Sequence, residues 1–510
     1  MTPVLLANAR LVGRPDLVDV LLVDGRVARI APAPASPAGV CAASDGEHVD
    51  LDGRHLLPGF WDAHVHLLQQ ALAARRLDVA SARSAREAAD LVAARVRRDP
   101  PRPGEVVVGF GFRAVGWPDQ PTAALLDAAG GGAPVALTSG DLHSGWFSTA
   151  ALARLGLTAD ASGLVREDDF FPVAGALDGG TPAERDAWVR AAAAQAATRG
   201  VVGVVDMEAV DPREWTRRLD GGPGEGPDVT RFPIRVEAAV WPQDVEAVLA
   251  AGLRPGDALA GARDAVGHAL VRLGPLKVIS DGSLNTRTAY CHDAYPGGGR
   301  GTLNVGPAEL APLLARAHGA GLRCAVHAIG DAAATLALDA FAATGTAGSL
   351  EHAQLLATTD LTRLAALGLV ASVQPAHLLD DRDVAEELWP GRTARAYRFA
   401  DLLVAGVRLA LGSDAPVAEL DPLLAVAAAV RRTGDARPPW HPEQRIGAVA
   451  ALLASTGGCG VRPSVGQVAD LVVLDGDPVA WARESTAGSR PRALGVAGTL
   501  LAGEWTHRAL

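Results

Sequence analysis

The sequence almost lacks lysine. Lysine and arginine together number 47 among 510 residues, and Lys277 is the only lysine. Heavy use of Ala, Gly, Arg and Pro, with only three asparagines, indicates a coding bias that replaced lysine by arginine almost everywhere. A guanidinium cannot supply the chemistry of a primary amine. We therefore expect the role of Lys277 to require an amine.

Cysteine and long apolar runs are also scarce. No Cys-x-x-Cys pair occurs, which argues against a disulfide framework and against a thiolate zinc site; the four cysteines are Cys41, Cys291, Cys324 and Cys459. The longest apolar stretches, such as 422–430, are far shorter than the roughly 18 residues of a membrane-spanning helix. The first residues do not combine a charged segment with a long apolar one. We expect a cytoplasmic protein with no membrane partner.

The charge pattern bears on possible partners. The net charge is −11 and the basic residues are dispersed, which argues against binding to nucleic acid. With 49% apolar and 21% charged residues, the composition is typical of a globular protein. A length of 510 residues exceeds what one core usually supports. We expect a small-molecule substrate, and a homodimer is the default oligomeric state.

Both ends of the chain have a pattern of short apolar strands and tight turns. The first end has candidate strands at 4–12, 18–30 and 48–51, and the other has them at 469–474 and 493–507. Neither end has enough strands to bury a sheet face by itself. We therefore predict that residues 1–57 and 465–510 pair into one small β-sandwich domain.

Residues 58–464 alternate apolar strands with helical patterns. The eight candidate strands are 59–66, 201–207, 234–240, 270–279, 322–328, 349–352, 369–373 and 407–411. Between them, Thr181 to Glu184 predicts a helix start with a capping box. This alternation predicts an α/β fold, a parallel (β/α)8 TIM barrel with its active site at the carboxyl ends of the strands. Residues 85–178 lie outside these eight strands and their helices, and we expect them to form an insertion near the barrel mouth.

Metal-binding residue types stand at the ends of these predicted strands. His64 and His66 are separated by one residue of the first strand. Because side chains alternate between the two faces of a strand, both histidines point in the same direction and can share an ion. By itself this pair is a weak signal, because two hydrogen-bonded strand histidines would look the same. The fifth, sixth and eighth strands end near His327, His352 and Asp414. Imidazole and carboxylate ligands at one end of a barrel predict a site for zinc or a similar divalent ion.

Six segments resemble the amidohydrolase superfamily, in particular its amidohydrolase-3 branch, which includes N-substituted formamide deformylases. They are PGFWDAHVHL (58–67), LKVISDGSLNTRTA (276–289), VHAIGD (326–331), LEHAQ (350–354), SVQPAHL (372–378) and LGSDAPV (411–417). The resemblance runs over nearly the whole chain. It implies the barrel fold and metal-dependent hydrolysis, but it does not name a substrate.

The same resemblance implies a ligand for each metal position. One ion is expected on His64, His66 and Asp414, and a second on His327 and His352. Lys277, carbamylated by CO2, would bridge the two. Zinc fits such ligands best, and other divalent ions also fit. Asp414 would be both a ligand and the acid/base that takes a proton from water and delivers it to the leaving group.

Other polar residues have more open interpretations. His143, in the insertion, either reaches the site, as a histidine in related proteins does, or is a surface-loop histidine. His377, after the seventh strand, is a candidate for contact with an oxyanion or substrate. Asp281 and Arg287 bind substrate or close structural ion pairs, and we favour the structural role. The alternative for Lys277 is a buried ion pair with Asp281.

The expected reaction is hydrolysis of an amide-type C–N bond by a metal-activated hydroxide. A mononuclear deaminase or a metal-dependent isomerase on the same fold is an alternative, although neither would require Lys277. A non-catalytic structural member of the fold is a further alternative, but all six expected ligand positions are occupied.

Aromatic residues suggest a substrate class. Only 4% of the chain is aromatic, yet large aromatics are concentrated in the region of the insertion, among them Phe110, Phe112, Trp117, Trp146, Phe170 and Phe171. Such residues line ligand pockets, which would suit a neutral or weakly polar N-acyl compound with an apolar substituent. They also form cores, and the sequence leaves both possibilities open.

Overall fold

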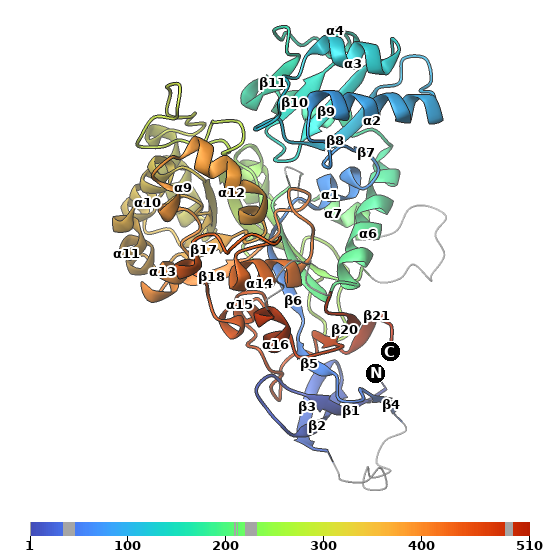
Figure 1. The fold of residues 1–510 in the computed structure, drawn as a ribbon. Coiled ribbons are helices and arrows are strands. Elements are labelled where there is room, and N and C mark those ends of the chain that lie inside the picture. Colours follow the sequence, from blue (N-terminus) through green and yellow to red (C-terminus); the bar gives the residue numbers. More distant parts are fainter. Residues whose placement is uncertain (1, 34–45, 209–210, 212, 220–231, 485–492) are drawn as a thin grey trace.

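The computed structural model of the protein describes residues 2–33, 46–208, 211, 213–219, 232–484 and 493–510. Figure 1 shows a central barrel, a sheet built from both chain ends on one side of it, and an inserted region beyond its opposite end. Cys41 lies outside the described residues, and the other three cysteines are free thiols.

The central barrel consists of eight parallel strands, which confirms the predicted fold. The strands are β6 (Phe60–Val65), β12 (Val201–Asp206), β13 (Arg235–Val240), β14 (Val271–Ile279), β15 (Cys324–Ala328), β16 (Gly348–His352), β17 (Val370–Val373) and β18 (Arg408–Leu411). They pair in chain order from β6 to β18. A parallel bridge between Val65 and Ala415 brings the last strand back to the first. Each predicted strand overlaps an observed one, because each buried run is bounded by glycine or polar residues.

Helices surround the barrel on its outer side (Figure 1). Those of the barrel region are α1 (Leu67–Ala73), α6 (Pro182–Ala197), α7 (Glu214–Leu219), α8 (Val245–Ala250), α9 (Pro307–Gly319), α10 (Asp331–Thr344), α11 (Thr358–Ala366), α12 (His377–Leu388), α13 (Phe399–Val404), α14 (Pro422–Arg431), α15 (Ala448–Ala454) and α16 (Pro478–Arg483). Helix α6 begins with the predicted capping box, in which Thr181 and Glu184 satisfy each other's backbone N–H groups.

The inserted region has a sheet and a core of its own. Its strands are β7 (Leu77–Asp78), β8 (Val107–Phe112), β9 (Val135–Ser139), β10 (Ser144–Phe147) and β11 (Leu164–Arg166), and its longer helices are α2 (Ala85–Arg98), α3 (Ala123–Gly130) and α4 (Thr149–Leu155). Strand β7 already belongs to this sheet, although the insertion was expected to begin only at residue 85. Phe112, Trp117 and Trp146 pack against one another, with ring centroids 6.2 to 6.3 Å apart.

Strands from both chain ends join in a third sheet. It contains β1 (Val4–Arg10), β2 (Leu17–Val23), β3 (Arg26–Pro32), β4 (Glu47–Asp50), β5 (His55–Pro58), β19 (Leu471–Leu474), β20 (Val496–Leu501) and β21 (Glu504–Arg508). All eight are hydrogen-bonded as one sheet, in which β5 pairs antiparallel with β19. Side chains from both ends, among them Leu6, Val20, Leu56, Val473 and Leu500, share one core.

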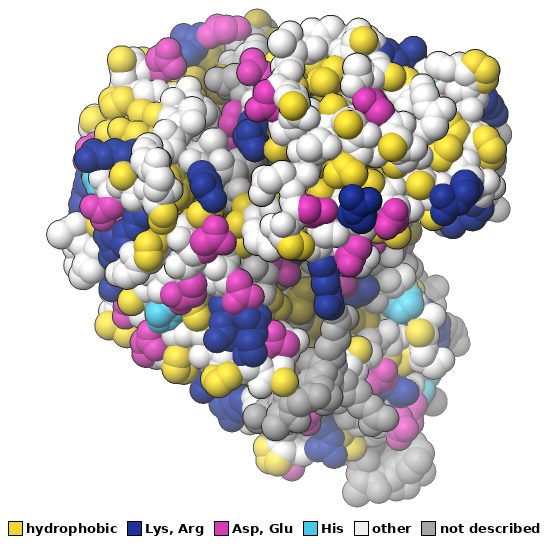
Figure 2. Space-filling view, turned by 45° about the horizontal axis from the view of Figure 1, so that its top comes forward, with side chains coloured by type: hydrophobic (Ala, Val, Ile, Leu, Met, Phe, Trp, Pro, Cys, Tyr) yellow, Lys and Arg dark blue, Asp and Glu magenta, His cyan; other side chains and the backbone are white. Residues whose placement is uncertain are grey.

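None of the helices in the described part of the chain has the length and apolarity needed to cross a membrane. On the face drawn in Figure 2, basic and acidic side chains are interspersed, as the dispersed charges of the sequence suggest.

Candidate active site

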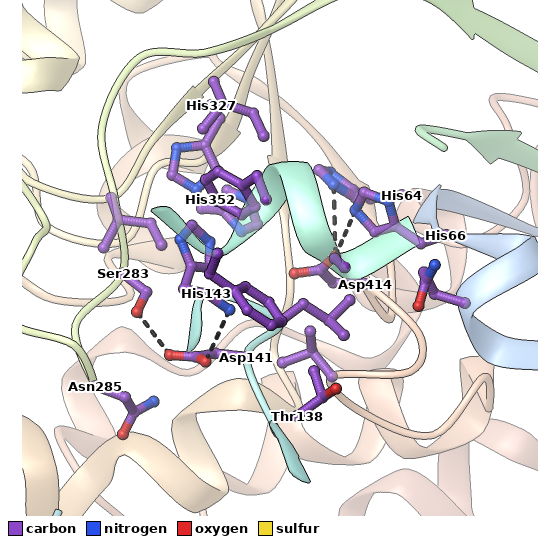
Figure 3. Close-up of a pocket in the computed structure, with 18 of the residues that line it drawn as sticks. His64, His66, Thr138, Asp141, His143, Ser283, Asn285, His327, His352 and Asp414 are labelled. Carbon is purple, nitrogen blue, oxygen red and sulfur yellow. Dashed lines mark hydrogen bonds and ion pairs between the residues drawn. The ribbon is translucent and has the colours of Figure 1, made fainter. Parts of the chain in front are cut away.

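A cavity of about 490 Å³ lies at the carboxyl ends of the barrel strands, beneath the inserted region. It brings together every site residue predicted from the sequence: His64, His66, His143, Lys277, His327, His352, His377 and Asp414. In Figure 3, His64, His66 and Asp414 lie on one side of the cavity, while His143, His327 and His352 lie on the other.

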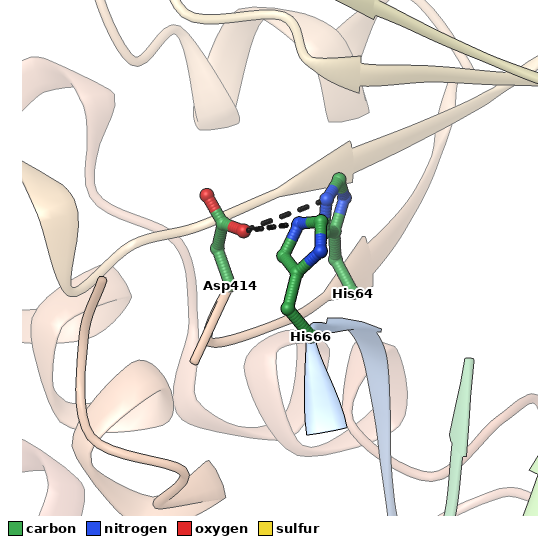
Figure 4. A group of neighbouring side chains, drawn as sticks. All are labelled: His64, His66 and Asp414. Carbon is green, nitrogen blue, oxygen red and sulfur yellow. Dashed lines mark ion pairs between the residues drawn. The ribbon is translucent and has the colours of Figure 1, made fainter. Parts of the chain in front are cut away.

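His64, His66 and Asp414 form the first candidate metal-binding group. Asp414 Oδ1 lies 3.5 Å from His64 Nε2 and 3.3 Å from His66 Nε2. Figure 4 shows the three side chains and these two contacts. The three donor atoms lie within 4.8 Å of one another. Burial alone would raise the pKa of Asp414, but His64 and His66 hold it well below its usual range. The group therefore presents one carboxylate and two imidazoles to a single point.

Glu351 determines which nitrogen of His64 faces the cavity. Its Oε2 atom lies 2.7 Å from His64 Nδ1, and both side chains are buried. A carboxylate only accepts hydrogen bonds, so Nδ1 carries the proton and Nε2 keeps its lone pair. Burial, together with the charge of Lys277, lowers the pKa of His64 to about 4. His64 is thus neutral at pH 7, the state in which an imidazole binds a metal.

His352, His377 and Asp414 form a second candidate group. His377 Nε2 lies 3.9 Å from Asp414 Oδ2, and the rings of His352 and His377 are stacked with centroids 6.4 Å apart. The structure groups His377 with these residues, whereas the resemblance implies His327 as the partner of His352. His327 is adjacent, since its ring centroid lies 4.5 Å from that of His352.

Asp281 holds His327 and the backbone around it. Its Oδ1 atom lies 3.0 Å from His327 Nδ1 and accepts from Ile329 N, while Oδ2 accepts from Tyr290 N and Gly330 N. Both oxygens are therefore occupied by partners other than Lys277. This agrees with the structural role favoured for Asp281.

Lys277 is buried in the barrel beside the first candidate group. Its Nζ atom lies 3.0 Å from His64 Nε2. Burial lowers the pKa of this amine, against the raising effect of Glu351 and Asp414. The predicted alternative, an ion pair with Asp281, is not the contact that Lys277 makes. Arg287, by contrast, is half-exposed and pairs with Glu387 at 3.6 Å.

Two site residues occupy the left-handed backbone region, which side chains other than glycine seldom adopt. Asp414 has φ 57° and His352 has φ 67°. Such strain persists only where surrounding contacts enforce it, and it concentrates at functional sites. For Asp414, the backbone N–H donates to His64 O at 2.7 Å. Gly412 permits this approach, because an added Cβ would lie 2.8 Å from His64 N.

The inserted region contributes His143 to the cavity. Glu167 Oε2 lies 2.9 Å from His143 Nδ1. Burial opposes protonation of His143, but the hydrogen bond and charge of Glu167, with Asp141 and Asp414 nearby, raise its pKa to about 9. His143 is therefore a part-buried residue of the cavity wall and not a surface-loop histidine.

The aromatics divide between the two roles that the sequence left open. Phe112, Trp117 and Trp146 belong to the core of the insertion. Phe170 and Phe171 line the cavity, and Phe171 packs its ring against that of His143 with centroids 5.5 Å apart. Part of the cavity wall is therefore apolar.

Sequence reasoning missed two carboxylates, Glu351 and Glu167. Strand alternation places Glu351 and His352 on opposite faces of β16. The left-handed backbone at His352 breaks this alternation, so both side chains reach the site. Glu167 is brought to His143 by the fold of the insertion, and no motif indicates it. For Glu351, its place beside His352 in LEHAQ was the available signal.

A parallel eight-stranded barrel with imidazoles and a carboxylate converging at its carboxyl ends defines a barrel enzyme with a candidate metal centre. Residues 47–507 match the model of the amidohydrolase family, and the chain belongs to this family. The predicted class, a hydrolase of C–N bonds, is thereby confirmed.

Several named proteins are similar in sequence. Protein LONG AFTER FAR-RED 3 of Arabidopsis thaliana is 30% identical over 80% of this chain and 74% of its own. The putative amidohydrolase YtcJ of Bacillus subtilis is 27% identical, covering 85% of this chain and 86% of that protein. The N-substituted formamide deformylase of Arthrobacter pascens is 28% identical over 93% of each chain.

Among solved structures, an uncharacterized metal-dependent hydrolase from Pyrococcus horikoshii has the same fold. The TM-score is 0.75 at 24% identity, covering 94% of this chain and 99% of the other. A second such hydrolase, from Pyrococcus furiosus, gives a TM-score of 0.71 at 24% identity, over 94% of this chain and all of the other.

Proposed function

We propose that this amidohydrolase is metal-dependent and hydrolyses the C–N bond of a small, neutral N-acyl compound, with an N-substituted formamide as the first candidate. The observation that carries the proposal is the first candidate group. Three donor atoms, from His64, His66 and Asp414, lie within 4.8 Å of one another in the cavity. Such convergence of two imidazoles and a carboxylate fits a divalent ion.

Two further imidazole nitrogens of the cavity also have the surroundings expected of metal ligands. His352 Nδ1 and His377 Nε2 are buried, and within the described residues neither has a hydrogen-bond partner. An orphaned buried nitrogen is costly unless it binds something. Burial, together with neighbouring His327, holds the pKa of His352 well below its usual value. We propose that zinc is the metal and that His327, His352 and Lys277 complete a second position, with Lys277 carbamylated.

The carbamate follows from the surroundings of Lys277. An ammonium among four histidines and a divalent ion would be repelled by the local positive charge. A carbamate replaces the cation by an anion with two oxygens that can bridge two metals. The lowered pKa of the Lys277 amine favours the neutral form that reacts with CO2. This agrees with the single position at which the chain uses lysine.

The protein's own groups would then carry the proton transfers. A bound divalent ion supplies Lewis-acid polarisation of the scissile carbonyl and of a water molecule. Asp414, ionised at neutral pH, accepts a proton from the attacking water and delivers it to the leaving nitrogen. His143 lines the cavity with Nδ1 held by Glu167, and it donates from its second ring nitrogen to the carbonyl oxygen as negative charge develops there. His377, beside Asp414, contacts the substrate from the other side.

The cavity wall supports the substrate class. Phe170, Phe171, Leu142 and Ile329 line it, and the relative at 28% identity over 93% of the chain is named an N-substituted formamide deformylase. Apolar linings with a few polar groups suit substrates with an apolar substituent.

Two measurements test this function. Elemental analysis of protein expressed with bicarbonate should give two divalent ions per chain, and a reproducible value of one with full activity would favour the mononuclear alternative. A panel of N-substituted formamides, acyl amines and charged N-acyl amino acids should be hydrolysed in that order of preference. A preference for the charged compounds would contradict the proposed substrate class.

A further inference from the structure

Glu167 holds His143 in two ways. The Glu167 backbone N–H donates to His143 O at 3.0 Å, and the Glu167 carboxylate lies 2.9 Å from His143 Nδ1. Glu167 itself is buried and has φ 47°, in the left-handed region. A residue in this backbone region persists only where surrounding contacts enforce the strain. The two contacts of Glu167 with His143 are therefore built into the fold and do not arise from chance proximity.

The second carboxylate oxygen of Glu167 reaches the barrel. Glu167 Oε1 accepts from the hydroxyls of Thr286 and Thr288, at 3.1 and 2.5 Å. These threonines lie in the loop after β14, the strand that contains Lys277. Glu167 therefore links a histidine of the insertion to a loop of the barrel, and the residues are more than a hundred positions apart in sequence.

The same loop makes a parallel contact with the residues next to His143. Asp141 Oδ2 accepts from Ser283 Oγ at 2.7 Å, and Asp141 Oδ1 accepts from His143 N at 3.2 Å; Figure 3 shows both bonds. Gly282 leaves the necessary space, since an added Cβ would lie 2.1 Å from Thr288 Oγ1 and 2.7 Å from Glu167 Oε1. The carboxylates and hydroxyls thus bring the His143 segment and the loop together over the cavity.

We propose that Glu167 is a positioning residue, which fixes the orientation of the His143 ring over the reaction centre through hydrogen bonds anchored on Thr286 and Thr288. This inference rests on the proposed function of His143 as a donor to the substrate carbonyl. With Nδ1–H donating to Glu167, Nε2 is the ring nitrogen left for substrate, and the protonated ring carries a second N–H there. Glu167 does not touch substrate itself, so it acts through His143 alone.

A double-mutant cycle tests this relation, using His143→Gln, Glu167→Ala and the double variant on the metal-loaded enzyme with the best formamide. Each single variant should lose about a hundredfold in kcat with little change in KM, because a misplaced or absent donor affects the transition state more than binding. In the His143→Gln background, adding Glu167→Ala should lower kcat by less than about a further threefold, as expected of two residues that act as a unit. Glu167→Gln, which retains an acceptor, should recover most of the rate.

The outcomes separate this inference from the proposed function. If His143→Gln keeps a rate near wild type, the role of His143 in the proposed function is wrong, and the positioning role falls with it. If His143→Gln is impaired but the two losses multiply in the double variant, the proposed function stands and the positioning role is refuted. Metal content should be unchanged in all variants.

Two further measurements guard against a folding effect. Glu105 is an exposed glutamate of the same insertion, so Glu105→Gln is the matched control and should leave kcat unchanged. If Glu167→Ala does not fold, the double variant Thr286→Val, Thr288→Val enters the cycle in its place, and it should lower kcat only when His143 is present. Crystal structures should show the His143 ring displaced without Glu167, and a ring kept within about 0.5 Å would overturn the inference without any activity assay.

Discussion

Replacing Glu351 by Gln should weaken metal binding without unfolding the protein. Glu351 Oε2 lies 2.7 Å from His64 Nδ1, and both groups are buried. Two unit charges at that distance would attract by roughly 6 kcal/mol at an effective dielectric constant of about 20. That figure does not apply, because burial and Lys277 lower the pKa of His64 to about 4 and its ring is neutral. The contact is a hydrogen bond from a neutral donor to a carboxylate.

The magnitude follows from that distinction. Hydrogen bonds to charged groups contribute about 1.5–3 kcal/mol and neutral ones about 0.5–1.5 kcal/mol. Replacing the carboxylate acceptor by the neutral amide of Gln should therefore reduce the free energy of metal binding by about 1–1.5 kcal/mol. This corresponds to about a tenfold loss of zinc affinity, at the lower end of the loss seen when partners of metal-binding histidines are removed.

Competition with a chromophoric chelator measures the affinity, and thermal unfolding checks the fold. Asp360→Asn is the matched control, because Asp360 is a buried carboxylate outside the cavity that accepts from the Thr335 hydroxyl. It should leave zinc affinity unchanged. A change below twofold for Glu351→Gln would refute the proposed role of Glu351, whereas a loss above a thousandfold would show that the pair is ionised.

Four other perturbations follow from the same site. Asp414→Asn should lower kcat by at least about a hundredfold with KM nearly unchanged, and steady-state rates within tenfold of wild type would contradict the acid/base role. Lys277→Ala should lose the second metal and regain some activity with added short carboxylates, whereas Lys277→Arg should stay inactive; an active, metal-replete Lys277→Arg enzyme would exclude the carbamate. Gly412→Ala places a Cβ 2.8 Å from His64 N, so thermal unfolding should show a destabilisation of about 1–3 kcal/mol, and an unchanged Tm would mean that the strand and loop separate easily. The pKa of His143 is raised from its usual 6.5 to about 9, so its stabilisation is complete below pH 6.5 and is lost as pH rises through about 9; the stability gap between wild type and His143→Gln should narrow over that range.

The barrel was predictable because its signals are local. Each strand is a buried apolar run, and each predicted ligand stands at or near the end of a run, as His327 does near the end of β15. The capping box at Thr181 and Glu184 is likewise contained within four residues. Parallel strands bring their carboxyl ends together, so strand order alone places these ligands side by side.

The remaining features depend on backbone geometry or on distant contacts. Strands β7, β10 and β11 have two, four and three residues, too few for a periodic signal. The positive φ of His352 reverses the expected direction of one side chain, and a period-two pattern cannot show this. Glu167 meets Thr286 across 119 positions of sequence, a contact that only the packing of the insertion on the barrel determines.

The sheet built from both chain ends has a consequence for synthesis on the ribosome. Strand β5 is made before the barrel, yet its antiparallel neighbour β19 is made only after the barrel. Until then β5 has an unpaired edge toward β19, and exposed edges are where nascent chains pair wrongly with one another. A chain stalled just before β19 would therefore possess a complete barrel and still be prone to aggregate. Translation of the last strands is the step that covers this edge and completes the sheet.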